Sequence, residues 1–426
     1  MNGTINHYQV DDTRLFSEKM LSWSSQFNIF CFAPSCGYES PYSRYDFLFA
    51  AEPTAIYQES NSWSPQSLQA FSNQHPDWLF GHLNYPGQDP DPVGFPACFF
   101  FNPGICITLN DHQLTIRSKQ RPPDEIWQSI NNSRLLSEDI GTLVTDIQPL
   151  QDQSDYLQSV EQVKRHIARG DCYELNYCQG FQARSTDFNP FSFFKRLIEE
   201  HPNPFSVLYR IEASFCICAS PERFLQRVGN TVISQPIKGT IRRSLSAPDA
   251  DKQLREQLSN SEKDRAENVM VVDLVRNDLS RVCTRNSVEV SELFGVYSFP
   301  NLHHLISTVQ GNVLEETPWT SILAACFPMG SMTGAPKQKV MEITTNLEKS
   351  ARGLFSGTIG YVDPSGQFDF NVVIRSVFYN QETGQLHFKA GGGITAASDP
   401  IKEYEESVLK AAAIHQLLSG KYPDHP

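Results

Sequence analysis

Two strand-like runs joined by Gly229-Asn230 place the strongest constraint on the fold of this chain. The runs RFLQRV and TVISQPI favour strands, and a two-residue Gly-Asn turn joins such neighbours as an antiparallel hairpin. The alternating runs LHHLISTVQG and FDFNVVIRSVFY also predict strands. Long helices are expected over residues 262–279 and from near Pro400 to about Leu418. Hairpins with separate long helices indicate the α+β class, with a largely antiparallel sheet.

A polar linker over residues 145–155, TDIQPLQDQSD, divides the sequence. It separates an N-terminal region (residues 1–145) from a second region (residues 146–426). A helix should follow the linker, with Ser154 as its N-cap and Gly170 after its end. A chain of 426 residues corresponds on average to about two or three domains, but large folds also form single units. We therefore expect the N-terminal region to pack into the same unit as the rest.

Composition and charge exclude some classes of protein. The formal net charge is −13 and no basic run occurs, which argues against a nucleic-acid surface but not against a small anionic substrate. The ten cysteines include no CxxC pair, so we expect reduced, mostly buried thiols in a cytoplasmic protein rather than a zinc site. The N-terminus lacks the pattern of a secretory signal, and no apolar run is long enough to span a membrane.

Acidic residues recur at helical spacing in two places. Asp264 and Glu267 are three residues apart on the first expected long helix, and Glu403 and Glu406 are three apart on the last. If the two pairs met across a cleft, their oxygens would suit Mg²⁺, which takes one or two protein carboxylates. Local alternatives remain open. Asp264 fits a capping box begun by Ser261, and Glu406 fits an ordinary i,i+4 pair with a lysine.

Two glycine-rich segments resemble phosphate loops only superficially. GSMTGAPK, residues 330–337, lacks the GK[ST] ending, and GGGIT, residues 391–395, lacks the dinucleotide-binding pattern of glycines. Backbone N–H groups without side chains can approach an anion closely, and tight turns are the alternative interpretation.

Glu222 and Lys238 flank the hairpin and lie close together in any plausible register. With a two-residue turn, Val228 faces Thr231 and Glu222 faces Ile237, which leaves Lys238 one step out of register. A three-residue turn or one bulge would set Glu222 directly opposite Lys238. A carboxyl and an amine so placed can act as an acid and a nucleophile, if the pKa of the amine is lowered. A cross-strand salt bridge is the alternative.

Several segments in the second region resemble those of chorismate-utilising enzymes, in the same order. The similarity runs from about residue 154 to 418, and the N-terminal region matches more loosely. The segments are GDCYELNYCQGF, SPERF, PIKGT, AENVMVVDLVRNDLSRV, HLISTVQG, FPMGSMTGAPK, RGLFSGTIGY and GGGITAASDPIKEYEESVLKA. The sequence departs from the family in three places: it has Glu174 where glutamine is usual, Phe355 where tyrosine is usual, and no recognisable LLES motif.

This resemblance implies a fold of two face-packed, largely antiparallel sheets flanked by helices, with the active site in a deep cleft. It also implies roles for individual residues. Glu267 and Glu406 match Mg²⁺ ligands, and Asp264 and Glu403 match supporting acids beside that ion. Glu222 matches the general acid, and Lys238 matches the covalent nucleophile. The positions that match the lining of the substrate pocket are Thr240, His304, Ser331, Arg375, Gly391, Gly392 and Gly393.

The segment PIKGT is similar to the branch of the family that aminates chorismate at C4, for p-aminobenzoate and folate biosynthesis. Anthranilate synthases usually have alanine in place of Lys238. No Gly-x-Cys-x-Gly nucleophile turn occurs, so we expect ammonia to come from a separate glutamine amidotransferase subunit. Anthranilate, isochorismate or salicylate synthesis are the alternatives within the family, and a non-catalytic chorismate-binding subunit is the alternative outside it.

Overall fold

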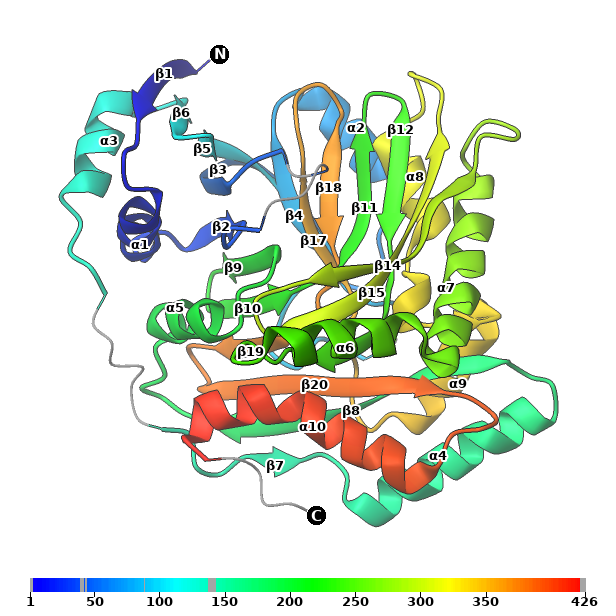
Figure 1. Cartoon of the computed structure of the whole chain (residues 1–426). Coiled ribbons are helices and arrows are strands. Elements are labelled where there is room, and N and C mark those ends of the chain that lie inside the picture. Colours follow the sequence, from blue (N-terminus) through cyan, green and yellow to red (C-terminus); the bar gives the residue numbers. More distant parts are fainter. Residues whose placement is uncertain (1–2, 39–41, 43, 88, 137–142, 422–426) are drawn as a thin grey trace.

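The computed structural model of the chain describes residues 3–38, 42, 44–87, 89–136 and 143–421 (Figure 1). Within these residues, twenty strands form one hydrogen-bonded network, and each pairing in it is antiparallel. Helices surround this network on several sides. The predicted α+β class with largely antiparallel sheet is confirmed.

The network has two arms. Strands of the first arm follow one another in the order β1 (Thr4–Gln9), β6 (Gln113–Ser118), β5 (Cys98–Asn110), β3 (Phe47–Glu59), β2 (Ile29–Pro34), β9 (Phe205–Ile211), β10 (Ser214–Ser220), β19 (Ser376–Asn380), β20 (Gln385–Ile394) and β8 (Glu174–Arg184). The short strands β7 (Gln148–Pro149) and β16 (Gly334–Ala335) pair with β8 at its outer side.

The second arm starts from the same long strands. Strand β5 pairs with β6 at one end and with β4 at the other, so β5 and its neighbour β3 belong to both arms. The order then runs through β4 (Leu79–Leu83), β17 (Thr358–Val362), β18 (Phe368–Asn371), β11 (Arg223–Val228), β12 (Thr231–Gln235) and β15 (Leu302–Asn312), with β13 (Ile237–Arg242) and β14 (Glu289–Ser298) also paired to β15.

Hydrophobic cores form between the arms and under the helices. One core joins side chains of both arms, such as Tyr209 and Cys216 from the first and Phe224 and Phe370 from the second. Another core lies between the first arm and the helices α1 (Thr13–Ser24), α3 (Pro123–Asn131), α5 (Pro190–Glu200) and α10 (Pro400–Ser419). The expected pair of face-packed sheets flanked by helices is therefore present, with two strands shared between the sheets.

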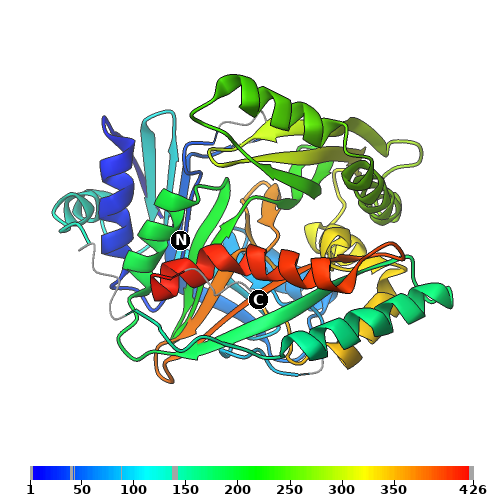
Figure 2. The ribbon, with the colours of Figure 1, turned by 60° about the horizontal axis from the view of Figure 1, so that its bottom comes forward.

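The remaining helices include α7, which packs against β13 and β15, and α4, which packs against α10. Figure 2 shows α10 lying along the sheet, with α4 beside it. The bounds of these helices are α2 (Pro65–Gln74), α4 (Gln153–Ala168), α6 (Pro248–Ser259), α7 (Glu262–Ser280), α8 (Trp319–Cys326), α9 (Lys337–Leu347) and the 3-10 helix η1 (Gly330–Met332).

Local signals predicted the long elements well and their ends less well. Helix α7 starts and ends within a residue of the predicted range, and α10 begins at Pro400 as expected. The predicted N-cap Ser154 is wrong: Asp152 caps α4, because its side chain accepts a hydrogen bond from the N–H of Asp155. Gly170 does follow this helix, with φ of 81°. The predicted linker contains the short strand β7 as well as the cap.

The run FDFNVVIRSVFY is not one strand. It forms β18 and β19, which pair with different neighbours and are separated by residues 372–375. Arg375 has a φ of 52°, in the left-handed region that is costly for a side chain of this size, so the chain turns there. Apolar residues continue through this break as Val372, Val373 and Ile374, and this is why the pattern does not reveal it.

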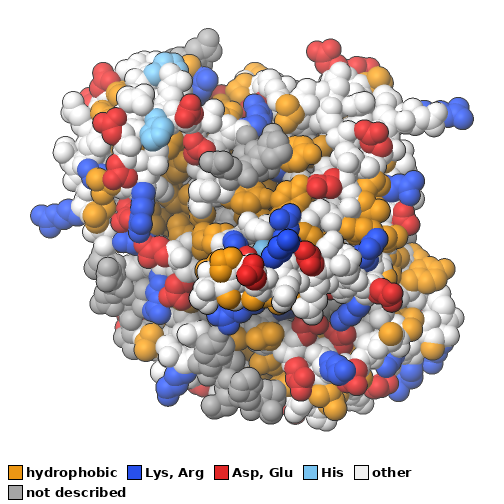
Figure 3. Space-filling view, viewed as in Figure 1, with side chains coloured by type: hydrophobic (Ala, Val, Ile, Leu, Met, Phe, Trp, Pro, Cys, Tyr) orange, Lys and Arg blue, Asp and Glu red, His pale blue; other side chains and the backbone are white. Residues whose placement is uncertain are grey.

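The surface and the cysteines agree with the composition. On the face drawn in Figure 3, acidic and basic side chains are interspersed, without a broad basic patch. All ten cysteines are free thiols, and most are buried. Within the described part of the chain, no helix combines the length and apolar character needed to cross a membrane.

Strand β2 of the N-terminal region pairs with β9 of the second region. The boundary near residue 145 stays a prediction.

Candidate active site

Lys238 and Glu174 form a buried salt bridge. Lys238 lies on β13, Glu174 is the first residue of β8, and Nζ lies 2.9 Å from Oε1. The two side chains are 12% and 3% exposed. Burial alone would lower the pKa of Lys238, but the carboxylates of Glu174, Glu267 and Glu222 outweigh it and hold that pKa above its ordinary value. Lys238 is therefore an ammonium ion in this state.

Glu222 immediately precedes β11 and is poised as an acid. The residue is 4% exposed, and burial raises the pKa of its carboxyl to about 7. The Ser331 hydroxyl and the Lys238 ammonium oppose this shift without cancelling it. A carboxyl with this pKa is protonated in a large fraction of molecules at neutral pH, and this is the state that a general acid requires.

The register that relates Glu222 to Lys238 differs from the predicted ones. Val228 faces Thr231, as expected for a two-residue turn, but a bulge between Arg223 and Gln226 shifts the pairing. The extra residue lies in β11, so Arg223 faces Gln235, and Lys238 moves further from the position opposite Glu222.

The prediction that a bulge sets Glu222 directly opposite Lys238 is therefore wrong. Pro236 ends β12, since it has no N–H for the ladder, and Lys238 belongs to β13, which pairs with β15 instead of β11. The side chains of Glu222 and Lys238 nevertheless lie close enough for their charges to shift each other's pKa.

Four carboxylates from two helices act on one lysine. Asp264 and Glu267 lie on α7, and Glu403 and Glu406 lie on α10. Partial burial lowers the pKa of Lys263, but these four carboxylates together raise it above its ordinary value. Its Nζ lies 3.8 Å from Glu267 Oε1. The two acidic pairs therefore converge, and Lys263 supplies a positive charge that they share.

The local alternatives for these acids are present too. Ser261 Oγ accepts a hydrogen bond from the backbone N–H of Asp264 at 3.3 Å, as an N-cap. Lys410 lies 2.7 Å from Glu406 and lowers the pKa of its carboxyl. Neither contact prevents the four carboxylates from facing one another. The cap uses only the backbone N–H of Asp264, which leaves its carboxylate available, and Glu406 has a second carboxylate oxygen that Lys410 does not occupy.

This donor set fits Mg²⁺ in chemistry, although it is not a ready-made cage. Among the described residues, no three His, Cys, Asp or Glu side chains are gathered at ligand spacing. Mg²⁺ needs few protein ligands, since water and substrate oxygens complete its shell. A Cβ at Gly392 would lie 3.4 Å from Glu403 Oε2 and 3.8 Å from Glu406 Oε1. The glycine thus keeps the backbone of β20 from crowding these carboxylates.

Arg375 is a half-buried cation. Among the described residues its guanidinium forms no hydrogen bond or salt bridge, and burial lowers its pKa. The burial of His304 on β15 lowers the pKa of that histidine, and the nearby charge of Arg375 lowers it further. Thr240 Oγ1 lies 2.9 Å from Nδ1 of His304, and the buried Nε2 has no hydrogen-bond partner among the described residues. A partly desolvated guanidinium without a partner is costly unless an anion joins it, so this part of the site is suited to an anionic ligand.

Ser331 and the glycine run complete the set of predicted residues. Ser331 lies on η1 and its hydroxyl has no hydrogen-bond partner of good geometry among the described residues, although it lies near enough to Glu222 to lower its pKa. The run from Gly391 to Gly393 lies inside β20, opposite β8, so the tight-turn interpretation is wrong. Close packing explains these glycines: a Cβ at Gly393 would collide with Glu174 Oε1.

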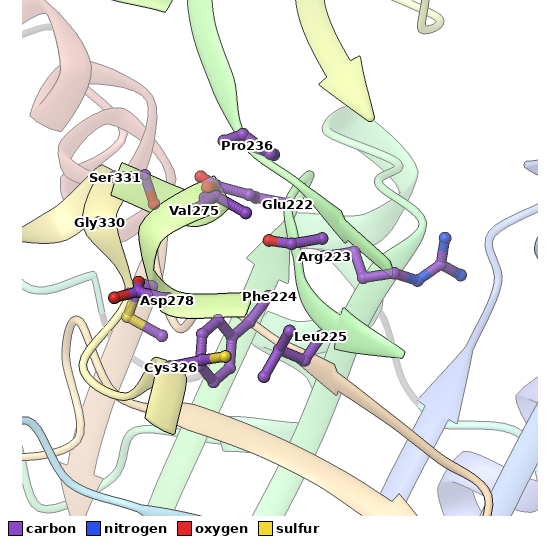
Figure 4. A pocket seen from close by; sticks show the side chains of 12 residues that line it. Glu222, Arg223, Phe224, Leu225, Pro236, Val275, Asp278, Cys326, Gly330 and Ser331 are labelled. Carbon is purple, nitrogen blue, oxygen red and sulfur yellow. The ribbon is translucent and has the colours of Figure 1, made fainter. Parts of the chain in front are cut away.

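A small pocket opens at the acid. Its lining includes Glu222, Ser331, Pro236 and Asp278. Figure 4 shows the side chains of Glu222 and Ser331 close together and that of Arg223 pointing away. Arg223 is occupied elsewhere, in a salt bridge with Asp369.

Two residues of the candidate site, Glu174 and Lys263, are not predicted as functional from the sequence. Glu174 was noted only as a departure from a motif, and Lys263 was not singled out at all. The signal for Glu174 was the unusual acid itself, but its distance of 64 positions from Lys238 hides their contact. Phe355, the other substitution within a motif, is 3% exposed and packs in the core between the arms.

A protein-family model described as chorismate binding enzyme matches residues 35–416. The chain belongs to the chorismate-binding enzyme family. Aminodeoxychorismate synthase component 1 of Salmonella typhimurium is 39% identical over 73% of this chain and 68% of the relative. The protein of the same name from Escherichia coli is 40% identical over 65% of this chain, but the match spans only 60% of that relative's own length.

Two solved structures share the fold. Anthranilate synthase component I from Streptococcus pneumoniae superposes with a TM-score of 0.75 at 26% identity, over 89% of this chain and 93% of the other. The menaquinone-specific isochorismate synthase MenF from Escherichia coli gives a TM-score of 0.78 at 18% identity, over 98% and 95% of the two chains. The match with MenF shows the fold alone. The face-packed arrangement of sheets is thus the one that chorismate-binding enzymes have.

Proposed function

We propose that this chain aminates chorismate at C4 with ammonia, giving 4-amino-4-deoxychorismate through a covalent adduct between Lys238 and C2. The observation that carries the proposal is that an amine, Lys238, lies close enough to an acid, Glu222, for the two to shift each other's pKa, and that the pKa of Glu222 is about 7. The names of the Salmonella and Escherichia relatives support the same reaction. The expected pathway is p-aminobenzoate and folate biosynthesis in the cytoplasm.

In the first displacement, Lys238 becomes covalently bonded to the ring of chorismate. Lys238, as a free amine, forms the N–C2 bond while both conjugated double bonds of the ring shift and the C4–O bond breaks. Glu222 gives its proton to the departing hydroxyl, which leaves as water. The adduct nitrogen then carries a positive charge, which makes it a good leaving group for the next step.

The second displacement reverses the shift. Ammonia bonds to C4, the two double bonds move back, and the C2–N bond breaks to release Lys238 as an amine. The new C4 ammonium returns a proton to Glu222. The balance is chorismate plus ammonia giving aminodeoxychorismate plus water, and two displacements return the new group to the carbon that lost the old one.

Arg375 and the acidic helices hold the substrate's carboxylates in this proposal. The unpaired guanidinium of Arg375 is suited to a two-pronged contact with one of them. Glu267 and Glu406 would hold Mg²⁺, with Asp264 and Glu403 beside it; when bound, Mg²⁺ neutralises the ring carboxylate as a Lewis acid. Thr240, His304, Ser331 and the glycines of β20 line the remaining space.

Ammonia comes from a partner in this proposal. The relatives' name, component 1, supports the existence of a second component. We propose a separate glutamine amidotransferase in this role, with free ammonium as a substitute in its absence.

Identification of the product tests the proposed function. Incubation with chorismate, Mg²⁺ and ammonium should give 4-amino-4-deoxychorismate by chromatography and mass spectrometry. Anthranilate, isochorismate or salicylate as the main product would assign the chain to another reaction of the family. Chorismate binding without turnover would indicate a non-catalytic subunit.

The acid role of Glu222 predicts a pH dependence. Its raised pKa means that the protonated form is present below about pH 7 and lost above it, so kcat/KM should fall about tenfold per pH unit on the alkaline side. Glu222→Gln cannot donate the proton and should lose roughly 100-fold or more in kcat. The variant should also lose this alkaline limb, and a wild-type profile that rises through pH 7 would contradict the role.

The anion-binding role of Arg375 predicts opposite effects on binding and stability. Arg375→Ala should raise KM for chorismate by roughly 30-fold or more, equivalent to about 2 kcal/mol. It should not lower the melting temperature of the ligand-free protein, since it removes a partly desolvated charge that has no partner among the described residues. A fall in melting temperature with unchanged KM would show a structural role instead.

A further inference from the structure

The proposed covalent step requires Lys238 as a free amine, whereas the structure holds it as an ammonium, and the inference below rests on that proposed function. Among the described residues, Nζ makes a single hydrogen bond, to Glu174 Oε1 at 2.9 Å, and no salt bridge to any other carboxylate. A proton leaving Nζ therefore has one acceptor in direct contact. The amide of a glutamine at this position could not take that proton.

Glu174 is poorly satisfied as a carboxylate. The residue is 2% exposed, and its second oxygen, Oε2, is buried with no hydrogen-bond partner among the described residues. An ionised carboxylate with an unpaired buried oxygen is costly, and a neutral carboxylic acid in the same place costs less. Transfer of the proton from Lys238 to Glu174 would replace two buried charges by two neutral groups, a change that surroundings of low polarity favour.

The backbone of β20 makes room for this contact. A Cβ at Gly393 would collide with Glu174 Oε1 and lie 3.1 Å from Lys238 Nζ. Only a residue without a side chain leaves the pair undisturbed. Three strands, β8, β13 and β20, thus contribute to one arrangement in which the carboxylate and the amine touch.

Other charged groups face the pair from three directions. Glu267 of α7 interacts with both members, Glu406 of α10 interacts with Lys238, and Glu222 does so from the start of β11. Their charges stabilise the ammonium form, but none forms a salt bridge with Nζ. These three carboxylates therefore influence the pKa of Lys238, but none of them is in direct contact with Nζ to receive its proton.

We propose that Glu174 is the internal base for the nucleophile: it accepts a proton from Lys238 when chorismate binds and returns it at the end of the cycle. The Nζ–H bond breaks, the proton joins Glu174 Oε1, and the lone pair of Nζ becomes free to attack C2. When ammonia expels Lys238 as a neutral amine, Glu174 gives the proton back and the starting salt bridge is restored. Glu174 is thus a positioning residue that acts through Lys238 and not on the reacting carbons.

Adduct formation in a single turnover tests this role. Wild type, Glu174→Gln and Glu174→Asp are mixed with chorismate and Mg²⁺ without ammonium between about pH 6 and pH 7, and the adduct is followed by intact-protein mass spectrometry. In wild type the proton stays within the site, so the rate should change less than about threefold over this range. Glu174→Gln must lose the proton to solvent, so its rate should be at least about tenfold lower at pH 6 and rise about tenfold per pH unit. Glu174→Asp should keep the flat profile at a reduced rate.

Two results would overturn the proposal. If Glu174→Gln forms the adduct at pH 6 as fast as wild type, or faster, then Glu174 only holds the ammonium in place. If the wild-type rate itself rises about tenfold per pH unit, the proton leaves to solvent and no internal base acts; this result is available even if the glutamine variant does not fold. Failure of the proposed covalent route gives a different result: the wild-type protein then converts chorismate to its product at full rate but carries no chorismate-derived adduct on Lys238 at any pH.

Discussion

Lys238→Ala is expected to abolish the chorismate-derived adduct and to reduce formation of 4-amino-4-deoxychorismate by about 100-fold or more. The physical reason is that the two other lysines beside these acids interact with other groups: Lys263 interacts with the carboxylates of α7 and α10, and Lys410 is held by Glu406 and the carbonyl of Gly391. Covalent catalysis makes the two-step route possible, and removal of the nucleophile removes the route. Intact-protein mass spectrometry in the absence of ammonium measures the adduct directly.

Two controls separate this effect from damage to the fold. Lys339→Ala removes a lysine from an exposed pair with Glu342 on α9 and should leave adduct formation unchanged. Lys238→Ala itself leaves Glu174 buried without its partner, which should destabilise the protein by about 3 kcal/mol. The double variant Lys238→Ala/Glu174→Gln should recover most of that stability without recovering the adduct. Covalent catalysis is wrong if wild type never carries the adduct and Lys238→Ala still turns over at full rate.

The fold was predictable to the extent that its signals are local. The Gly229-Asn230 turn depends on neighbouring residues, and it forms with the expected pairing of Val228 and Thr231. The bulge that follows depends on how β11 fits against both β12 and β18, where the register also shifts. The pairing of β11 with two strands at once is a tertiary property, and no residue type in this stretch of the sequence indicates it.

The sequence predicts which residues belong to the candidate site better than it predicts the contacts between them. The i,i+3 spacing placed Glu267 and Glu403 on helix faces, but only the packing of α7 and α10 shows that both pairs act on Lys263. Likewise, the unusual acid Glu174 was visible in the sequence, whereas its contact with Lys238 requires the pairing of β8 with β20 and the open space at Gly393. The unpaired state of Arg375 could not be foreseen, because absence of a partner has no sequence pattern.

Glu267→Gln is expected to lower Mg²⁺-dependent turnover by about 100-fold or more. Burial raises the pKa of Glu267, and the positive charges of Lys238 and Lys263 oppose that shift. Nearby cations therefore stabilise its ionised form, which is the form that a divalent cation binds. Glutamine keeps the shape but loses the charge, which weakens the hold on Mg²⁺ and hence the neutralisation of the ring carboxylate. The measurements are the Mg²⁺ concentration for half-maximal activity and the Mg²⁺ affinity by calorimetry in the presence of chorismate.

Glu262→Gln is the matched control, since Glu262 begins the same helix, carries the same charge and is exposed. It should change the Mg²⁺ requirement little, because the charges that raise the pKa of Lys263 come from Asp264, Glu267, Glu403 and Glu406 and not from this residue. Lys263 offers an independent check: its ammonium competes for the four carboxylates, so Lys263→Met should lower the Mg²⁺ concentration for half-maximal activity while Glu267→Gln raises it. Full activity of the wild-type protein in excess EDTA would show that the acids of α7 and α10 serve the salt bridges alone, with no metal ion in the reaction.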